Sequence, residues 1–195
     1  MKIYHYKIIL FCLIILGSCT NKRYETTTKP FNYEPNITED ISFLDINAFA
    51  QDSLGYMWIA TLGGLDRYNG YEFLHFSHQT SDSTSLLNDF VLSLLIDSSH
   101  NLWIGTSTGL NRYNYEKQCF EKYFSKYTVP IYSLFESYNG NIWVATPAGP
   151  GYIDKKKHSI AFLDLPQSVN LFWEDKAHHL WMGLNEETGL AYKKK

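Results

Sequence analysis

The fold is decided by two similar stretches, Gln51-Asp-Ser-Leu-Gly-Tyr-Met-Trp-Ile-Ala-Thr-Leu-Gly-Gly-Leu-Asp-Arg-Tyr68 and Ile96-Asp-Ser-Ser-His-Asn-Leu-Trp-Ile-Gly-Thr-Ser-Thr-Gly-Leu-Asn-Arg-Tyr113. Two further stretches, at 136–153 and 174–192, align with them on a tryptophan. The aligned tryptophans are 45, 40 and 38 residues apart, at Trp58, Trp103, Trp143 and Trp181. Self-similarity at such a spacing indicates a protein built from repeats, each of which is one supersecondary unit.

Other columns of the alignment recur together with the tryptophan. Six residues before it stand Asp52, Asp97, Ser137 and Asp175, and three residues before it stand Gly55, His100, Gly140 and His178. A Gly-Leu pair follows at Gly64, Gly109 and Gly189, with Gly149-Pro150 as the altered copy. Residues shared by all repeats usually make the packing that all repeats share. We therefore interpret the tryptophans as core side chains between neighbouring repeats, rather than as sugar-stacking platforms, and the aspartates as turn residues.

Each repeat has the pattern of antiparallel strands joined by tight turns. An alternating apolar run such as 91–96 precedes the Asp-Ser-x-Gly turn, and Trp-Ile-Gly-Thr and Gly-Leu-x-Arg-Tyr supply the next two strands. In the first repeat, Asn69-Gly70 predicts a type I′ turn into a fourth strand at 71–76. Four antiparallel strands in about 40 residues have the size of one β-propeller blade. The predicted fold class is all-β, with four-stranded antiparallel blades forming a partial or four-bladed propeller whose last blade is incomplete.

The composition excludes several classes of protein. Hydrophobic residues make up 45% and charged residues 19%, which is the balance of a globular chain. Aromatic residues reach 16%, and such side chains favour pleated, half-buried surfaces. The formal net charge is −3, so no basic excess exists to neutralise phosphates. Nucleic acid is therefore not an expected partner.

Residues 1–19 have the composition of an export signal. Lys2 and Lys7 give a positive start, and the apolar run 8–16 spans roughly 14 Å of helix, too short for a stable membrane span. The Leu16-Gly-Ser-Cys19 sequence resembles a bacterial lipobox, which implies acylation of Cys19. The alternatives are an ordinary signal peptide with an incidental cysteine and an uncleaved anchor. We expect an exported, periplasmic lipoprotein attached to the membrane through Cys19.

Residues 20–40 are polar and predict a tether, in which Phe31-Asn-Tyr33 is a candidate edge strand. The repeats occupy 41–195. With Cys12 in the signal and Cys19 acylated, Cys119 is the remaining thiol, so no intrachain disulfide is expected.

Residues able to perform catalysis or bind metal do not gather in the sequence. Glu136 and Glu174 have no carboxylate partner at a defined spacing, which argues against a glycosidase-like pair. His75 and His78, like the adjacent His178 and His179, fall on opposite faces of a strand. We therefore assign no catalytic residue, no metal ligand and no cofactor.

The pattern Asp-Ser-x-Gly-x-x-Trp-Ile-(Ala/Gly)-Thr-x-x-Gly-Leu-(Asp/Asn)-Arg-Tyr resembles the two-component regulator propeller repeat, as do residues 64–73 and 85–91. The resemblance covers about 41–195 and is weaker in the last two repeats, where Pro150-Gly151 and Leu184 depart from the pattern. It implies the periplasmic sensor region of a hybrid histidine kinase, where propellers precede an immunoglobulin-like domain, a membrane span and a cytoplasmic kinase. Such sensors are associated with glycan fragments, so an oligosaccharide is the implied ligand.

The expected function is ligand sensing in a phosphorelay. We expect this chain to be the amino-terminal piece of such a receptor or a shortened relative. In either case we expect no kinase and no catalysis in it. Two alternatives belong to other classes: a propeller enzyme, such as a lyase or glycoside hydrolase, and a surface lipoprotein that serves as an interaction scaffold. A strand at 31–33 completing the last blade would close a four-bladed ring. The resemblance favours an open arc instead, whose exposed end blades predict self-association.

Overall fold

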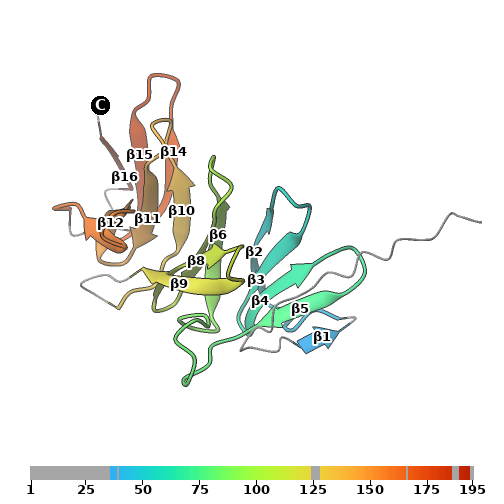
Figure 1. Cartoon of the computed structure of the whole chain (residues 1–195). Helices are drawn as coiled ribbons and strands as arrows, with labels where there is room; N and C mark the ends of the chain where they lie inside the picture. Colours follow the sequence, from blue (N-terminus) through green and yellow to red (C-terminus); the bar gives the residue numbers. More distant parts are fainter. Residues whose placement is uncertain (1–35, 39, 124–127, 166, 186–188, 194–195) are drawn as a thin grey trace, which may run out of the picture. The chain divides into compact units, whose positions relative to one another are not determined.

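The computed structural model describes residues 36–38, 40–123, 128–165, 167–185 and 189–193. The predictions about residues 1–19, Cys19 and the strand at Phe31–Tyr33 lie outside this part of the chain. The described backbone forms strands β1 to β16 and contains no helix (Figure 1). Accordingly, it contains no helix with the length and apolar character needed to cross a membrane.

The strands form four antiparallel sheets that follow one another along the chain. The first comprises β1 (Asn36–Thr38), β2 (Ile46–Gln51), β3 (Met57–Thr61), β4 (Gly64–Tyr68) and β5 (Phe73–Phe76). The second comprises β6 (Val91–Ile96), β7 (Leu102–Thr106), β8 (Gly109–Asn114) and β9 (Cys119–Tyr123). The third comprises β10 (Ser133–Glu136), β11 (Ile142–Thr146), β12 (Gly149–Asp154) and β13 (Ser159–Phe162). The fourth comprises β14 (Val169–Glu174), β15 (Leu180–Leu184) and β16 (Leu190–Lys193).

This arrangement confirms the predicted all-β class and the four-stranded repeat. Within each sheet the strands pair in chain order, and β1 adds an outer strand to the first sheet by pairing with β5. The fourth sheet contains three described strands. Among the described strands, those of the first sheet make no extended contact with those of the fourth.

The first strand of three of the sheets contains a bulge at the same repeat position. The register shifts between Ile46 and Ala48 in β2, between Val91 and Ser93 in β6, and between Val169 and Leu171 in β14. A bulge places an extra residue in one strand and thereby reverses the alternation of side chains between the two faces of the sheet. As a result, the residues that lie twelve and nine positions before the tryptophan of the same repeat point to the same face of the sheet.

One predicted turn is wrong. A type I′ turn needs positive φ at both central residues, but only Gly70 has it, at 99°, while Asn69 does not. The strands pair at Tyr68 and Phe73, so the loop contains four residues instead of two. The Asn69 side chain accepts hydrogen bonds from the backbone N–H groups of Tyr71 and Glu72, both at 2.9 Å. This local hydrogen bonding stabilises the wider turn.

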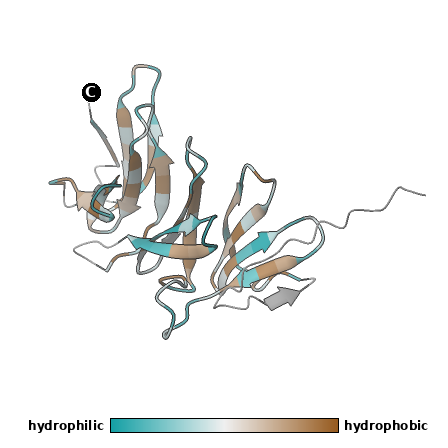
Figure 2. Cartoon of the chain, in the orientation of Figure 1, coloured by the Kyte–Doolittle hydropathy of each residue, from teal (hydrophilic) through white to brown (hydrophobic). Residues whose placement is uncertain are grey.

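Three hydrophobic clusters lie between successive sheets. One contains Trp58 of the first sheet and Val91 of the second, the next joins the second sheet to the third, and the last contains Trp143 and Phe172 from the third and fourth. The first strands contact one another in series, β2 with β6, β6 with β10 and β10 with β14. Figure 2 shows hydrophobic residues along these strands and hydrophilic residues in the connecting loops. Each sheet is thus stabilised by burial against its neighbours.

Candidate functional site

The recurring aspartate connects a turn to the core. Oδ1 of Asp97 accepts hydrogen bonds from the backbone N–H groups of Ser99 and Asn101, at 3.0 and 2.8 Å. Oδ2 accepts a hydrogen bond from Nε1 of Trp103 at 2.9 Å. The Asp97 side chain is fully buried. One carboxylate therefore closes the hairpin between β6 and β7 and also satisfies the only polar atom of a buried indole.

The same aspartate–tryptophan bond occurs in the first and fourth repeats. Oδ2 of Asp52 lies 2.7 Å from Nε1 of Trp58, and Oδ2 of Asp175 lies 3.0 Å from Nε1 of Trp181. In the third repeat, Ser137 is too short for this role, and its hydroxyl donates within the turn to Asn139 and to the Asn141 carbonyl. Sequence reasoning identified the turn but missed the indole bond. The signal was available in the constant six-residue spacing, which brings both ends of one hairpin together.

The fourth position of this turn requires left-handed backbone. The φ angles are 88° at Gly55, 63° at His100, 76° at Gly140 and 62° at His178. Histidine is among the residues other than glycine that adopt this region most readily. His100 and His178 thus replace a glycine for conformational reasons.

The histidine side chains contact separate partners. Nδ1 of His179 lies 2.9 Å from Asp175, and Nδ1 of His178 lies 3.2 Å from Glu174. His75 contacts the buried Asp66 at 2.7 Å. The described residues hold no group of three or more histidine, cysteine or acidic side chains suited to a metal ion.

The recurring Gly-Leu glycines serve two different purposes. Gly64 has φ 138°, and an added Cβ there would lie 2.4 Å from the Phe76 carbonyl oxygen. The Thr61 hydroxyl donates to the Gly64 carbonyl at 2.9 Å, and Thr106 does the same for Gly109. Gly189 has φ 60° and open space around its Cα. The fourth repeat therefore keeps the glycine but lacks the close packing that the first repeat requires.

The exposed fraction of each tryptophan depends on whether a neighbouring sheet covers it. Trp58 and Trp103 are completely buried, and Trp143 is 7% exposed. Trp58 contacts Tyr113 of the second sheet, with ring centroids 4.9 Å apart, and Trp143 contacts Phe172 of the fourth at 6.0 Å. Trp181 is only partly buried and stacks on Tyr192 of its own sheet. The structure therefore places three of the four tryptophans between sheets.

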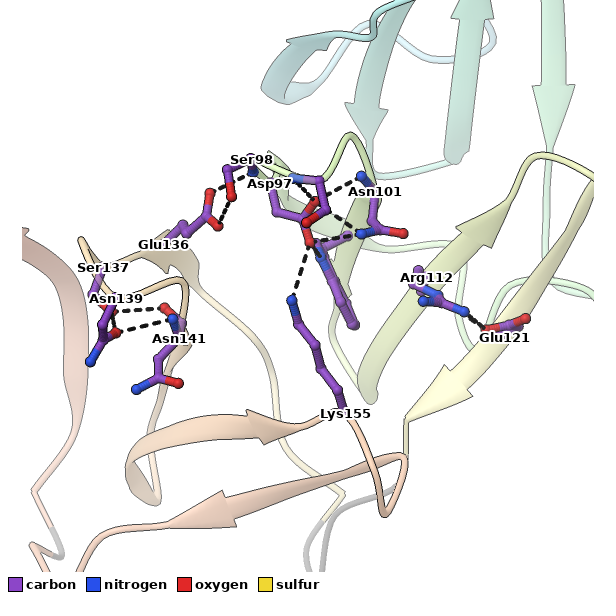
Figure 3. A network of polar contacts seen from close by, with 12 residues as sticks. Asp97, Ser98, Asn101, Arg112, Glu121, Glu136, Ser137, Asn139, Asn141 and Lys155 are labelled. Atoms are coloured by element: carbon purple, nitrogen blue, oxygen red, sulfur yellow. Dashed lines mark hydrogen bonds and ion pairs between the residues drawn. The ribbon is translucent and has the colours of Figure 1, made fainter.

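Polar side chains also link neighbouring sheets. Figure 3 shows Glu136 of β10 accepting hydrogen bonds from the backbone N–H and the hydroxyl of Ser98, both at 2.6 Å. Lys155, after β12, reaches the Asp97 carboxylate of the second sheet at 3.6 Å (Figure 3). The hydroxyl of Tyr115 donates to Asp52 of the first sheet at 3.1 Å. The aspartate is thus the point at which each of the first two turns contacts the following sheet.

These contacts shift the pKa values of the groups that take part in them. Burial raises the pKa of Asp97, but hydrogen bonds from Trp103 and Asn101, together with Lys155, outweigh it and hold this pKa below its ordinary value of 3.8. The backbone N–H of His179 and the indole of Trp181 lower the pKa of Asp175 strongly. Burial and the neighbouring Asp52 raise the pKa of Tyr115. Both aspartates are therefore charged acceptors at neutral pH.

Large exposed side chains gather where the first strands of the sheets begin. We call this set the strand-start surface: Phe43, Leu44, Phe90 and Tyr132. They lie just before β2, β6 and β10, which contact one another in series. The Asn47 side chain donates to the Val91 carbonyl here at 2.8 Å, and Ser107 contacts Asn88 at 2.8 Å. Sequence reasoning missed this surface because its residues differ from repeat to repeat in type and in their distance from the tryptophan.

The strand-start surface places exposed aromatic rings beside amide and hydroxyl groups. Exposed aromatic rings next to amide and hydroxyl groups suit a ligand that has both apolar faces and hydrogen-bonding groups. Glu136 and Glu174, the acids first considered for catalysis, instead accept hydrogen bonds from the turns of preceding sheets.

Comparison with known proteins finds a similarity in three of the repeats. The family model described as two component regulator propeller matches residues 40–63, 85–108 and 128–148. The extracellular domain of the hybrid two component system BT3049 from B. thetaiotaomicron has a similar structure, with a TM-score of 0.67 and 18% identity, over 83% of this chain and 24% of that one. The extracellular domain of BT4673 from the same organism gives 0.61 and 22%, over 75% and 21%.

Enzymes with a similar fold occur as well. Virginiamycin B lyase from Staphylococcus aureus gives a TM-score of 0.57 at 17% identity, over 77% of this chain and 56% of that one. At this identity the likeness shows the fold alone. The chain spans about a quarter of the length of the B. thetaiotaomicron structures. No curated protein matches the sequence significantly.

Proposed function

We propose that the chain is a ligand-binding part of a two-component sensor. The premise is that its repeats belong to the two-component regulator propeller family. The observation that carries this proposal is the match of that family model to three successive repeats, each of which folds as a sheet in the structure. The similar B. thetaiotaomicron structures are extracellular domains of two-component systems, which supports the same role and an exported location.

The proposed ligand is an oligosaccharide. The family resemblance motivates the class, and the strand-start surface supports it, because aromatic rings stack on the apolar faces of sugars while amides bind hydroxyl groups. We place the ligand on Phe90 and Tyr132, which come from neighbouring sheets.

A binding screen with Ala variants tests this proposal. Purified protein is titrated calorimetrically with a panel of plant and host oligosaccharides. For a binding oligosaccharide, we expect Phe90→Ala and Tyr132→Ala each to weaken affinity by about tenfold. Tyr71→Ala is the matched control, because Tyr71 is an exposed aromatic in the hairpin between β4 and β5. Failure of every oligosaccharide to bind, or an equal effect of Tyr71→Ala, contradicts the proposed ligand.

Catalysis is not part of the proposed role. The recurring acidic residues are engaged in turns and in contacts between sheets, so they are not free to exchange protons with a substrate. We therefore expect the purified chain neither to bind ATP nor to incorporate phosphate. Phosphate transfer to any of its histidines, measured with labelled ATP, would contradict this expectation.

A further inference from the structure

The arginine that follows the Gly-Leu pair has an acid partner in the second repeat but, among the described residues, none in the first. From this difference we infer that Arg67 of β4 binds a carboxylate group of a small ligand. Arg67 pairs with Trp58, next to the turn between β2 and β3, whereas the strand-start surface lies before the first strands. The inference therefore concerns a second site and does not depend on the oligosaccharide proposed above.

The second repeat shows how a carboxylate binds at this position. Arg112 of β8 lies directly opposite Glu121 of β9, the outermost strand of its sheet. Nε and Nη2 of Arg112 donate hydrogen bonds to Oε2 of Glu121, at 3.1 and 2.6 Å (Figure 3). Both side chains of this pair are partly exposed. An arginine at this point of the repeat can therefore present two adjacent N–H groups to a carboxylate that is open to solvent.

The first repeat contains the arginine without the acid. Leu74 of β5 stands opposite Arg67, where Glu121 stands opposite Arg112. No described residue gives the Arg67 guanidinium a hydrogen-bond acceptor or a carboxylate in ion-pair contact. The side chain is only partly buried, and none of its nitrogen atoms is buried without a partner, so these atoms reach solvent. A carboxylate from outside the chain can therefore make the contacts that Glu121 makes in the second repeat.

Three aromatic rings hold the Arg67 guanidinium in place. Its Cζ atom lies 4.4 Å from the ring centroid of Tyr56, 5.6 Å from that of Trp58 and 6.0 Å from that of Phe76. A guanidinium that stacks on a ring uses its flat face, while its N–H groups lie in its plane and stay available to an acceptor. The backbone N–H of Tyr56 donates to Asp52 at 3.0 Å, so the turn fixes the nearest ring. The guanidinium is thus positioned before a ligand binds, which reduces the entropy lost on binding.

The two repeats position their arginines by different contacts. Two residues before the tryptophan stands Tyr56 in the first repeat and Asn101 in the second. The Asn101 side chain donates to Asp97 and does not stack, and Cζ of Arg112 lies 6.0 Å from the centroid of its tryptophan. The second arginine is therefore held mainly by an ion pair and the first by stacking. Stacking leaves the positive charge of the first arginine without an acid in contact, and an anionic ligand supplies that acid.

The site suits a single carboxylate and should bind it weakly. Adjacent N–H groups of a guanidinium match the two oxygens of a carboxylate, a group that acidic sugars and simple organic acids both carry. The Asp52 carboxylate lies in the same cluster, where it accepts hydrogen bonds from Trp58 and Tyr115, and it repels an anion. One charge-assisted contact under these conditions corresponds to a dissociation constant of about 5–50 mM.

NMR of the arginine side chains tests the inference. The chain has three arginines, Arg23, Arg67 and Arg112, so each Nε–H signal can be followed separately. The full chain carrying Cys19→Ala, which removes the site predicted for lipid attachment, is titrated at about pH 6, where carboxylates are ionised. The probes are sodium acetate, sodium galacturonate, and galactose with sodium chloride at matched ionic strength, each to about 100 mM. We expect the Arg67 signal to shift saturably with a carboxylate, and the Arg112 signal to stay unchanged because its guanidinium already binds Glu121.

Leu74→Glu is the decisive variant. It places an acid opposite Arg67, as in the second repeat, so binding of either carboxylate should weaken at least about tenfold. Leu74→Gln is the matched control, because it has the same size without the charge, and it should keep the response of the parent. Circular dichroism checks that both variants fold. If Leu74→Glu does not fold, the comparison of Arg67 with Arg112 in the parent decides.

The two carboxylates distinguish the sources of the ligand group. A response to both supports the inference with the carboxylate as the sufficient group, and a response to galacturonate alone supports it with an acidic sugar as the ligand. An Arg67 signal that ignores both, or that shifts equally with galactose and sodium chloride, overturns the inference. An Arg112 signal that shifts equally also overturns it, as does a folded Leu74→Glu variant that responds like the parent or a Leu74→Gln variant that loses the response.

Discussion

Asp97 stabilises both the turn of its repeat and the packing of that repeat. Its carboxylate accepts from two turn amides and from a buried indole, and it contacts Lys155 of the next sheet. A buried donor without a partner costs about 1–3 kcal/mol. The side chain therefore matters less as an acid than as a fixed acceptor, and its charge makes the acceptor strong.

The stability of the protein should depend on the ionisation of Asp97. The pKa of this carboxyl is below 3.8 in the folded protein, so folding favours the charged form. Its contribution is fully present above the unfolded pKa and is lost as the pH falls through the folded pKa. We expect Asp97→Asn to be less stable at pH 7 by about 1–3 kcal/mol and the difference to shrink below pH 4. Urea unfolding from pH 7 to pH 2.5 measures this, and a difference that stays constant contradicts the role of the charge.

The two kinds of glycine should respond differently to a methyl group. Gly189→Ala places alanine at φ 60° in open space, where the cost is about 1–2 kcal/mol. Gly64→Ala places a Cβ 2.4 Å from the Phe76 carbonyl at φ 138°, so β4 and β5 must separate and the loss should be clearly larger. Thermal melts of both variants decide this. Equal losses would mean that the hairpin tolerates the added group.

At the scale of elements, the unit of stability is the interface between two sheets. Hydrophobic clusters join the first sheet to the second, the second to the third and the third to the fourth, and the first strands contact one another in series. The stability of such an array is approximately a sum of terms for each sheet and each interface. The position of a residue along the array therefore decides how much its loss costs.

The tryptophans of the second and fourth sheets should differ for this reason. Trp103 is completely buried and packs in one cluster with residues of the third sheet. Trp103→Ala should cost roughly 3–5 kcal/mol and unfold the marginal chain. Trp181 stacks on Tyr192 and is partly exposed, so Trp181→Ala should cost clearly less. Guanidinium unfolding of both variants measures the two losses. Equal losses would show that the fourth sheet is as fully packed as the second.

At the scale of the whole molecule, localisation is the property most open to a direct test. The Leu16-Gly-Ser-Cys19 sequence predicts lipid attachment at Cys19. Expressed in a bacterium, the parent should partition with membranes and incorporate labelled fatty acid, whereas Cys19→Ala should do neither. A Cys19→Ala variant that fractionates and labels like the parent would rule out the lipid anchor. Cys119→Ala is the matched control and should leave both properties unchanged.

The sequence by itself determined the repeat, its strand order and the turn residues. These features depend on contacts between residues close in the chain, such as Asp97 with Trp103, and recurrence at a fixed spacing reveals them. The Asn69-Gly70 loop escaped prediction because a single side chain with two hydrogen bonds outweighed the usual preference of that dipeptide.

Only the tertiary structure decided which faces of the sheets are covered. The bulge between Ile46 and Ala48 reverses the alternation along β2, so Ile46 and Phe49 share the exposed face while Ala48 and Ala50 pack toward the second sheet, a division that hydropathy alone does not reveal. The strand-start surface was likewise invisible, because Phe90 and Tyr132 are 42 residues apart and share no motif. Packing of the first strands brings such residues to one surface. The local pattern of a chain fixes its strands, whereas burial between strands distant in sequence fixes which side chains remain exposed to bind.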